Sequence, residues 1–153
     1  MSWEISERAF EEAIEAALLR FGPDAYEWEA GVLRDAGVAP YGEMPPGGYR
    51  RRETRDYDPG LCLLPRDVVD FVLATQPREW KKLEQHHGTA IRERFLQRLA
   101  AEIGRRGCLD VLRRGIKDSG AKISLAYFRP ASGLNEETGR LHAANLFAVV
   151  RQL

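Results

Sequence analysis

Residues 61–106 read LCLLPRDVVDFVLATQPREWKKLEQHHGTAIRERFLQRLAAEIGRR. Apolar side chains recur in this stretch every three or four residues, which is the spacing of one buried helical face. These side chains are Leu61, Leu64, Val68, Phe71, Val72, Trp80, Leu83, Ile91, Phe95, Leu96, Leu99 and Ile103. Pro77 can open a second helix and Gly88 separates it from a third. The stretch therefore predicts three consecutive helices.

Another helix is predicted before this stretch, beginning after Ser6, a good N-cap residue. It has one apolar stripe, formed by Phe10, Ala13, Ile14, Ala17, Leu18 and Phe21. Beside the stripe, Glu7, Glu11 and Glu15 recur every four residues. One interpretation is a solvated acidic face near the helix N-terminus, where the macrodipole favours negative charge.

Between these helical stretches, residues 24–38 favour a helix or a helix pair, and residues 39–48 have the turn chemistry of a loop. Four arginines follow on the predicted loop, flanked by tyrosines: Arg50, Arg51, Arg52 and Arg55. They could hold a nucleic-acid backbone. Alternatively, they form a hydrated surface run that pairs with neighbouring acidic residues, Glu53, Asp56 and Asp58.

The pattern changes after residue 107. Residues 108–116 are ambiguous between helix and strand. Ile123, Leu125 and Tyr127 alternate with Ser124, Ala126 and Phe128, which favours a strand over 121–129 with one buried face. A second strand is predicted over 144–151. The fold class expected is therefore α+β, with a helical N-terminal part that leads into a partial sheet.

Length and composition indicate one domain over 1–153, because 153 residues suffice for a single core. Basic and acidic residues number 23 each, which excludes a polybasic tail protein but not a local DNA-binding patch. The sequence has neither an apolar stretch long enough for a membrane span nor a signal peptide. Two cysteines, Cys62 and Cys108, exclude a disulfide scaffold, so a cytoplasmic location is expected.

Few motifs for catalysis are present. There is no phosphate-binding loop and no Gly-x-Ser-x-Gly elbow. The sequence by itself does not exclude a Ser-His-Asp triad. His86 and His87 are adjacent, so on a helix they point about 100° apart and chelate poorly. Since Cys62 and Cys108 lie far from them in sequence, we expect no zinc site.

Glu79-Trp80-Lys81 has the E-x-K form of metal-dependent nucleases, in which the glutamate binds Mg²⁺. The two side chains must share one face, as positions i and i+2 do on a strand. On a helix they lie about 200° apart. Because Glu79 and Lys81 follow Pro77 in a helical context, we interpret this match as coincidental.

Five phrases occur in a characteristic order along the chain. They are Cys62-Leu63-Leu64-Pro65, Phe71…Thr75-Gln76-Pro77-x-x-Trp80-x-x-Leu83, Gly107-x-Leu109-Asp110-Val111-Leu112-Arg113-x-Gly115-x-Lys117-Asp118-x-Gly120, Leu125-x-Tyr127-Phe128-x-Pro130-Ala131-Ser132-Gly133-Leu134-Asn135 and Asn145…Val149-x-Arg151-Gln152-Leu153. Together they resemble the N-terminal region of the R (restriction and motor) subunit of type I restriction endonucleases. The opening residues 6–11 also look like that family's first helix.

The resemblance implies a nuclease domain of the restriction-endonuclease-like PD-(D/E)xK class, with a mixed sheet that carries Mg²⁺ ligands and with residues 61–106 as a helical insertion. In the family, two ATP-driven motor domains follow. The subunit joins modification and specificity subunits, translocates double-stranded DNA and cleaves it when translocation stalls. By register, the catalytic and metal-binding glutamate of the first helix would be Glu11, with Glu7 as the second choice.

The sequence departs from the family at its C-terminal end. The family's metal-binding Asp and E-x-K follow the Arg151-Gln152-Leu153 phrase, where this sequence ends. We therefore expect the chain alone not to cleave DNA, because one carboxylate by itself does not hold Mg²⁺, which usually needs more than one anionic oxygen ligand. A second departure is His142, where the family usually has an aromatic residue, and Leu146, where it has arginine.

A second basic group, Arg113, Arg114 and Lys117, could contact phosphates or could neutralise Asp110 and Asp118.

For the whole chain, a different hypothesis is a non-catalytic interaction module. In that reading the helical insertion docks on partner subunits or motor domains. A truncated remnant without function is the third reading.

Overall fold

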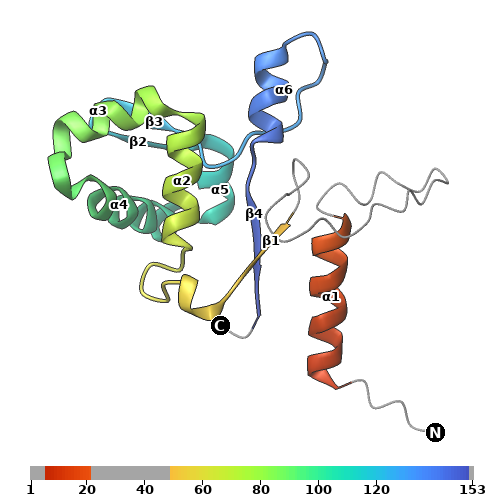
Figure 1. The fold of residues 1–153 in the computed structure, drawn as a ribbon. Helices are drawn as coiled ribbons and strands as arrows, with labels where there is room; N and C mark the ends of the chain where they lie inside the picture. Colours follow the sequence, from red (N-terminus) through yellow and green to blue (C-terminus); the bar gives the residue numbers. More distant parts are fainter. Residues whose placement is uncertain (1–5, 22–48, 152–153) are drawn as a thin grey trace, which may run out of the picture. The chain divides into compact units, whose positions relative to one another are not determined.

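A computed structural model describes residues 6–21 and 49–151 of the chain. The chain forms two compact units (Figure 1): Met1–Thr54 with Leu146–Leu153, and Arg55–Asn145. Both helices and small sheets are present, so the α+β expectation is confirmed. The predicted insertion at 61–106 lies inside the second unit. No helix in the described ranges has the length and apolar character needed to cross a membrane.

The first unit contains helix α1 (Glu7–Phe21) and two strands, β1 (Tyr49–Arg52) and β4 (Phe147–Val150). The strands pair in parallel, from Tyr49 opposite Phe147 to Arg52 opposite Val150. The first of these pairs also stacks its rings, with centroids 5.4 Å apart.

Two sequence predictions for this unit are confirmed and one is wrong. Helix α1 forms where apolar periodicity predicts it, and strand β4 forms within the range 144–151 predicted for a strand. The arginine run was expected on a loop, but its first part is strand β1. The helix predicted over 24–38 and the loop over 39–48 lie outside the described residues.

Helix α1 turns an unexpected face toward β1. Phe10 and Ile14 of the predicted apolar stripe are 60% and 45% exposed, whereas Glu15 of the acidic row is only 7% exposed. A solvated face is therefore the wrong interpretation for Glu15, although it holds for the exposed Glu7.

The second unit is mainly helical. Its elements are α2 (Pro65–Thr75), α3 (Pro77–His87), η3 (Gly88–Ala90), α4 (Ile91–Arg106), α5 (Cys108–Arg114), β2 (Ile116–Asp118), β3 (Ala121–Ile123) and α6 (Glu136–Ala143), with the turn η2 (Thr54–Asp56) at its start. The three predicted helices are thus confirmed as α2, α3 and α4. Pro65 and Pro77 stand in the first turns of α2 and α3, where a missing N–H costs nothing.

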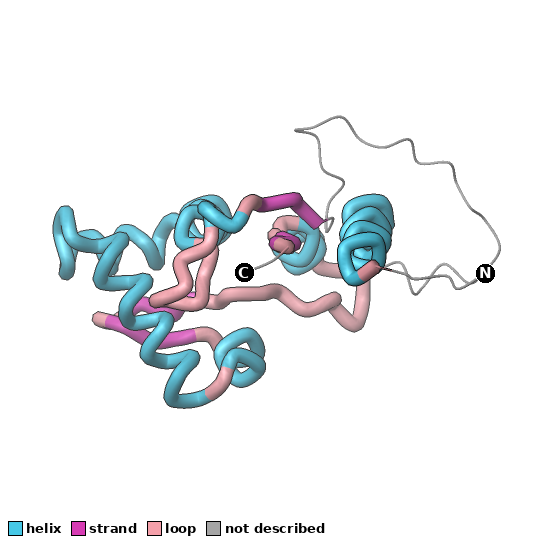
Figure 2. Tube along the Cα trace, turned by 90° about the horizontal axis from the view of Figure 1, so that it is seen from below, coloured by secondary structure: helices cyan, strands magenta, loops and turns pink. Residues whose placement is uncertain are grey.

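This unit packs helices α3 and α4 against the β2–β3 hairpin (Figures 1 and 2). Its buried apolar side chains are Val69, Phe71, Val72, Trp80, Leu83, Ile91, Phe95, Leu99, Val111, Ile116, Ala121 and Ile123. Trp80 of α3 meets Phe95 of α4 edge to face, with ring centroids 5.4 Å apart. Ile116 and Ile123 lie opposite each other on the buried face of the hairpin.

The strand predicted over 121–129 ends at Ile123, and two side-chain amides bind the extended chain beyond it. The amide of Gln76 donates to Ser124 O at 2.8 Å and accepts from Ser124 N at 2.7 Å. The amide of Asn145 donates to Tyr127 O at 2.6 Å and accepts from Tyr127 N at 2.9 Å. Side chains thus satisfy backbone groups that a neighbouring strand would otherwise pair.

Candidate functional site

The buried carboxylate of Glu15 is the centre of the candidate site in the first unit. Arg51 Nε of strand β1 lies 2.9 Å from its Oε1, and Arg151 Nε, directly after β4, lies 2.9 Å from its Oε2. Arg151 also reaches Glu12, with 3.5 Å between Nη1 and Oε1. One helix and both strands are therefore tied together by a single carboxylate.

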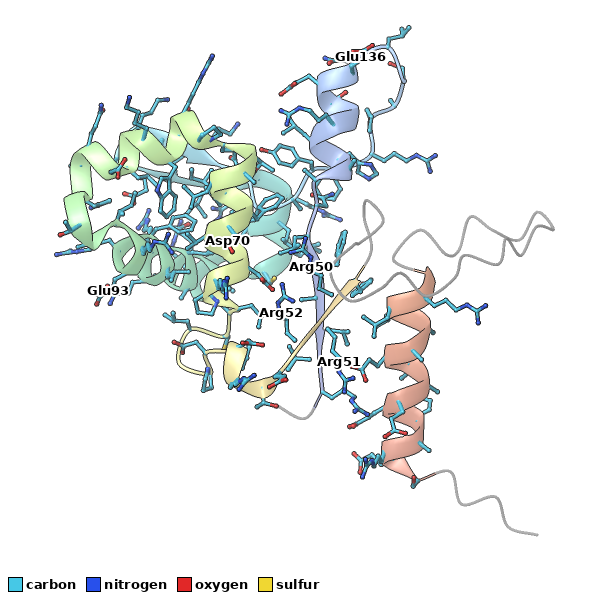
Figure 3. The ribbon with its side chains drawn as sticks, viewed as in Figure 1. Arg50, Arg51, Arg52, Asp70, Glu93 and Glu136 are labelled. Carbon is cyan, nitrogen blue, oxygen red and sulfur yellow. The ribbon has the colours of Figure 1, made fainter. Side chains whose placement is uncertain are left out.

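Strand geometry explains which arginine of the run takes part. Side chains alternate between the two faces of a strand, so Arg51 points to one side while Arg50 and Arg52 point to the other. Figure 3 shows Arg51 on the side of β1 that faces α1. A buried carboxylate must be paired to avoid a large desolvation cost, and Arg51 and Arg151 supply that pairing.

Glu11 lies one helical turn before Glu15 on the same face of α1. Its side chain is partly buried, and its Oε2 is fully buried without a hydrogen-bond partner among the described residues. A buried carboxylate oxygen without a partner is costly, and such atoms often face a ligand or a water. Of the two glutamates predicted for catalysis, Glu11 is thus half-buried in the unit, whereas Glu7 is exposed.

The described residues do not complete a magnesium site. They contain no group of three or more His, Cys, Asp or Glu side chains that could hold a metal ion. Both oxygens of Glu15 already accept from arginines, so Glu15 does not offer a free ligand. Glu11 alone could supply one anionic oxygen, and Mg²⁺ is usually bound through one or two carboxylates together with phosphate groups.

The second predicted basic group lies in the other unit. Arg114 Nε pairs with Asp110 Oδ1 at 3.1 Å, which is the neutralising role. Arg113 and Lys117 are exposed and form no ion pair with any described residue. Lys117 stands directly opposite Lys122 on the exposed face of the hairpin.

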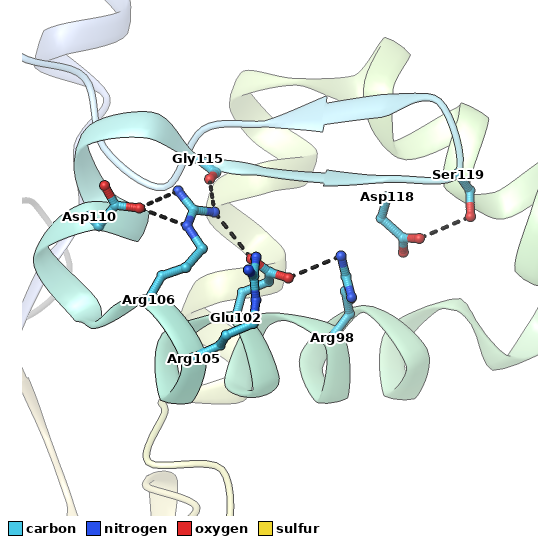
Figure 4. A network of polar contacts seen from close by, with 8 residues as sticks. All are labelled: Arg98, Glu102, Arg105, Arg106, Asp110, Gly115, Asp118 and Ser119. Carbon is cyan, nitrogen blue, oxygen red and sulfur yellow. Dashed lines mark hydrogen bonds and ion pairs between the residues drawn. The ribbon is translucent and has the colours of Figure 1, made fainter.

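Sequence reasoning missed a second buried carboxylate, Glu102 of α4, which is 4% exposed (Figure 4). Arg98 Nη2 lies 3.0 Å from Oε1, while Arg105 Nη2 and Arg106 Nη1 lie 2.7 and 3.2 Å from Oε2. Mainly the hydrogen bond from Arg105, and then the one from Arg106, lower the pKa of Glu102. The spacing of these residues, three and four positions from Glu102, was the available signal.

Arg106 extends this cluster to the next helix and strand. Its Nε donates to Asp110 Oδ2 at 2.7 Å, and its Nη1 donates to Gly115 O at 3.0 Å. The hydrogen bond to Asp110, and then the one to Glu102, raise the pKa of Arg106. The guanidinium therefore links α4, α5 and the start of β2.

The E-x-K match lies on helix α3, as expected. Glu79 Oε1 lies 2.6 Å from Lys82 Nζ, and its Oε2 accepts from Lys122 N at 2.9 Å. Both oxygens are thus used within the fold, and Lys81 is exposed. This geometry agrees with a coincidental match.

A Ser-His-Asp group does occur, formed by Ser119, His87 and Asp118. His87 Nε2 lies 3.1 Å from Asp118 Oδ2 and 3.5 Å from Ser119 Oγ, and the hydroxyl donates to Asp118 Oδ1 at 2.9 Å. In a catalytic triad, serine and aspartate contact opposite ring nitrogens. Here both contact the same nitrogen, which is not the arrangement of a triad. The contacts join α3 to the hairpin turn.

In chemical terms, the first unit offers carboxylates held by arginines and the second offers clustered guanidinium groups. Cys62 and Cys108 are free thiols on the surface.

Comparisons with protein-family models, with curated proteins and with solved structures found no match to this chain.

Proposed function

We propose that this chain is the N-terminal part of the R subunit of a type I restriction endonuclease. The parent subunit would cleave unmodified foreign double-stranded DNA with Mg²⁺ after ATP-driven translocation. It would act in the cytoplasm, in a complex with modification and specificity subunits. The five ordered sequence phrases are the basis for this proposal.

One observation of the first unit carries the proposal further. Glu11 has a fully buried oxygen without a partner among the described residues, on a helix packed against a parallel strand pair. In the family that the chain resembles, a glutamate of the first helix can approach the metal site. In this proposal Glu11 is that carboxylate, and the Glu15–Arg51 and Glu15–Arg151 ion pairs position the helix that bears it.

The strand pair also favours a larger sheet. Parallel pairs are slightly less stable per residue than antiparallel ones, and isolated two-stranded sheets are marginal. Within the described part of the chain, β4 has β1 as its sole partner. The proposal therefore places the family's Asp and E-x-K on further strands beside β4.

The test compares two chains with supercoiled plasmid DNA and MgCl₂. We expect this chain not to nick the plasmid, because its described residues lack a complete metal site. A longer chain that continues through the Asp…Glu-x-Lys segment of the parent gene should cleave it. Glu11→Gln should abolish that cleavage, whereas Glu7→Gln, at an exposed position, should retain it.

The proposal is wrong if the parent gene lacks that segment, or if Glu11→Gln leaves cleavage by the longer chain unchanged. Cleavage by the present chain would also contradict it.

A non-catalytic interaction module is the second candidate. Exposed apolar side chains on two helices favour it: Phe10 and Ile14 on α1, and Leu109 and Leu112 on α5. This candidate predicts that the purified chain binds the modification and specificity subunits without Mg²⁺. Replacing Leu109 and Leu112 by serine should weaken that binding, and sedimentation of the mixed proteins measures it.

A further inference from the structure

Positive charge is concentrated in residues 91–117, although the whole chain is neutral. This stretch holds eight basic side chains and three acidic ones, a net charge of +5. The basic residues are Arg92, Arg94, Arg98, Arg105, Arg106, Arg113, Arg114 and Lys117, and the acidic ones are Glu93, Glu102 and Asp110. The remainder of the chain therefore carries a net charge of −5.

Ion pairs within the fold leave this excess uncompensated. Glu102 is shared by three arginines, and Asp110 is shared by Arg106 and Arg114. Four guanidinium groups thus face two carboxylates. Arg94, Arg113 and Lys117 form no ion pair with any residue that the structure describes.

Three of these arginines form a row along one flank of α4. Arg94, Arg98 and Arg105 lie at positions i, i+4 and i+11 of the helix, which places them within about 40° of one another. At about 1.5 Å per residue, the row is about 16 Å long. We call these three residues the α4 arginine row.

Buried Glu102 positions two members of the row. Arg98 and Arg105 each use one terminal nitrogen on Glu102, yet their side chains are 47% and 70% exposed. Figure 4 shows both arginines beside Glu102 on α4. A guanidinium has five N–H donors, so most of its donors stay available to a second anion. Ordering of the side chains before binding lowers the entropy cost of capturing that anion.

Phosphodiesters fit the row better than isolated anions. The planar guanidinium fork matches phosphate oxygens bidentately. Each DNA strand carries one phosphate per about 3.4 Å of helix axis, so the row spans roughly five base pairs. We propose that the α4 arginine row binds the phosphate backbone of double-stranded DNA. The choice of DNA rests on the proposed function, but the surface lies in the second unit and needs no Mg²⁺ or Glu11.

The test measures binding of a fluorescent 30-base-pair duplex by anisotropy, over a range of salt concentrations and without Mg²⁺. The variant changes Arg94, Arg98 and Arg105 to glutamine. The control changes three exposed basic residues away from the row to glutamine, Arg66, Arg78 and Arg140. Each lost phosphate contact should lower the slope of log affinity against log salt by about 0.9. For the row variant we expect an affinity at least about tenfold lower than that of the wild type. We also expect its salt slope to be smaller by the equivalent of two to three phosphate contacts.

Arg94→Gln alone keeps the measurement independent of folding, because Arg94 forms no ion pair with a described residue. This variant should lower the salt slope by the equivalent of about one phosphate contact and leave the thermal unfolding temperature unchanged. The proposal is overturned if wild-type chain does not bind the duplex, or if row and control variants bind alike. It is also overturned if poly-glutamate competes as well as DNA at equal charge, which would identify an acidic protein partner.

Failure of this proposal is distinguishable from failure of the proposed function. DNA binding through the row together with a longer chain that does not cleave would refute the nuclease alone. Cleavage by the longer chain with row-independent binding would refute the row alone.

Discussion

Gly115 stands between helix α5 and strand β2, at a backbone conformation that favours glycine, with φ of 66°. An added Cβ would lie 2.2 Å from the carbonyl oxygen of Ile123, a backbone atom of the paired strand. Its own carbonyl accepts from Arg106. The close approach of two backbone segments therefore requires a residue without a side chain.

We expect Gly115→Ala to destabilise the protein by about 2 kcal/mol or more, since it combines a positive φ with a backbone clash. Gly104→Ala is the matched control. Gly104 lies inside α4 with no atom within 4 Å of an added Cβ. Alanine there should stabilise the helix by about 0.5–1 kcal/mol. Urea unfolding measures the free energy of unfolding of both variants. The same change for Gly115→Ala and Gly104→Ala would contradict the steric argument.

Glu15 is the residue on which the first unit depends, because its carboxylate receives both Arg51 and Arg151. Glu15→Gln removes the charge and leaves two guanidinium groups without their shared partner. We expect local opening to become easier, with amide hydrogen exchange in β1 and β4 faster by about tenfold or more.

Glu12→Gln is the control for that change, since Glu12 is about half exposed and its ion pairs are at the surface. It should leave exchange in both strands nearly unchanged. Equal protection in the Glu15 and Glu12 variants would show that the buried ion pairs do not hold the strands.

At the scale of elements, the helices were predictable and the strand pairing was not. Contacts three and four residues apart decide a helix, so α2, α3 and α4 follow from local apolar spacing and from Pro65, Pro77 and Gly88. Strand β1 forms in an arginine run with no apolar alternation, because its partner β4 comes from near the other end of the chain. Such pairing leaves no local signal.

In the segment after β3, the sequence predicts the backbone conformation but not the hydrogen-bond partners. Alternation over 123–128 is typical of a strand, and the chain there is held through backbone hydrogen bonds, as a strand would be. Its partners, however, are the amide side chains of Gln76 and Asn145. Sequence periodicity indicates an extended backbone but not which groups pair with it.

The candidate site was predictable in its residue types but only partly in its arrangement. The row of glutamates indicated a face of α1 with special chemistry, and the resemblance selected Glu11. Burial of Glu15 instead of Phe10 runs against hydrophobicity, and it depends on two arginines from distant strands. Charge pairing across the chain, rather than apolar spacing, decides which face of α1 is buried.

Helix α4 carries a pH dependence through Glu102. Its pKa is lowered in the folded protein, mainly by the hydrogen bond from Arg105. A lowered folded-state pKa means that the contribution is present above the unfolded value, about 4.3, and is lost as pH falls through the folded value. We expect wild type to exceed Glu102→Gln in stability at pH 7.

The difference between wild type and Glu102→Gln should narrow steadily below about pH 4. Urea midpoints of both proteins from pH 7 to pH 3 measure it. Gln97→Glu, at an exposed position of the same helix, provides the control for adding or removing one charge. A difference that stays constant with pH would show that the carboxylate contributes through packing and not through its charge.

At the scale of the whole molecule, the two units are built on different interactions. The first joins one helix to a parallel strand pair through Glu15, and its α1 exposes Phe10 and Ile14. The second contains every residue of the buried apolar core that the structure describes, between Val69 and Ile123. Burial of apolar surface is the main favourable term in folding, so the second unit should be the stable part of the chain.

We therefore expect residues 55–145, expressed alone, to fold cooperatively with a helical circular dichroism spectrum. Leu83 is fully buried between the helices, and Leu83→Ala should destabilise both this fragment and the whole chain by about 2–5 kcal/mol. Leu109→Ala, at a position 59% exposed, should change either stability little. Fragment unfolding without a cooperative transition would show that this core needs residues outside the unit to fold. Equal effects of the two leucine changes would contradict the role of Leu83 in the core.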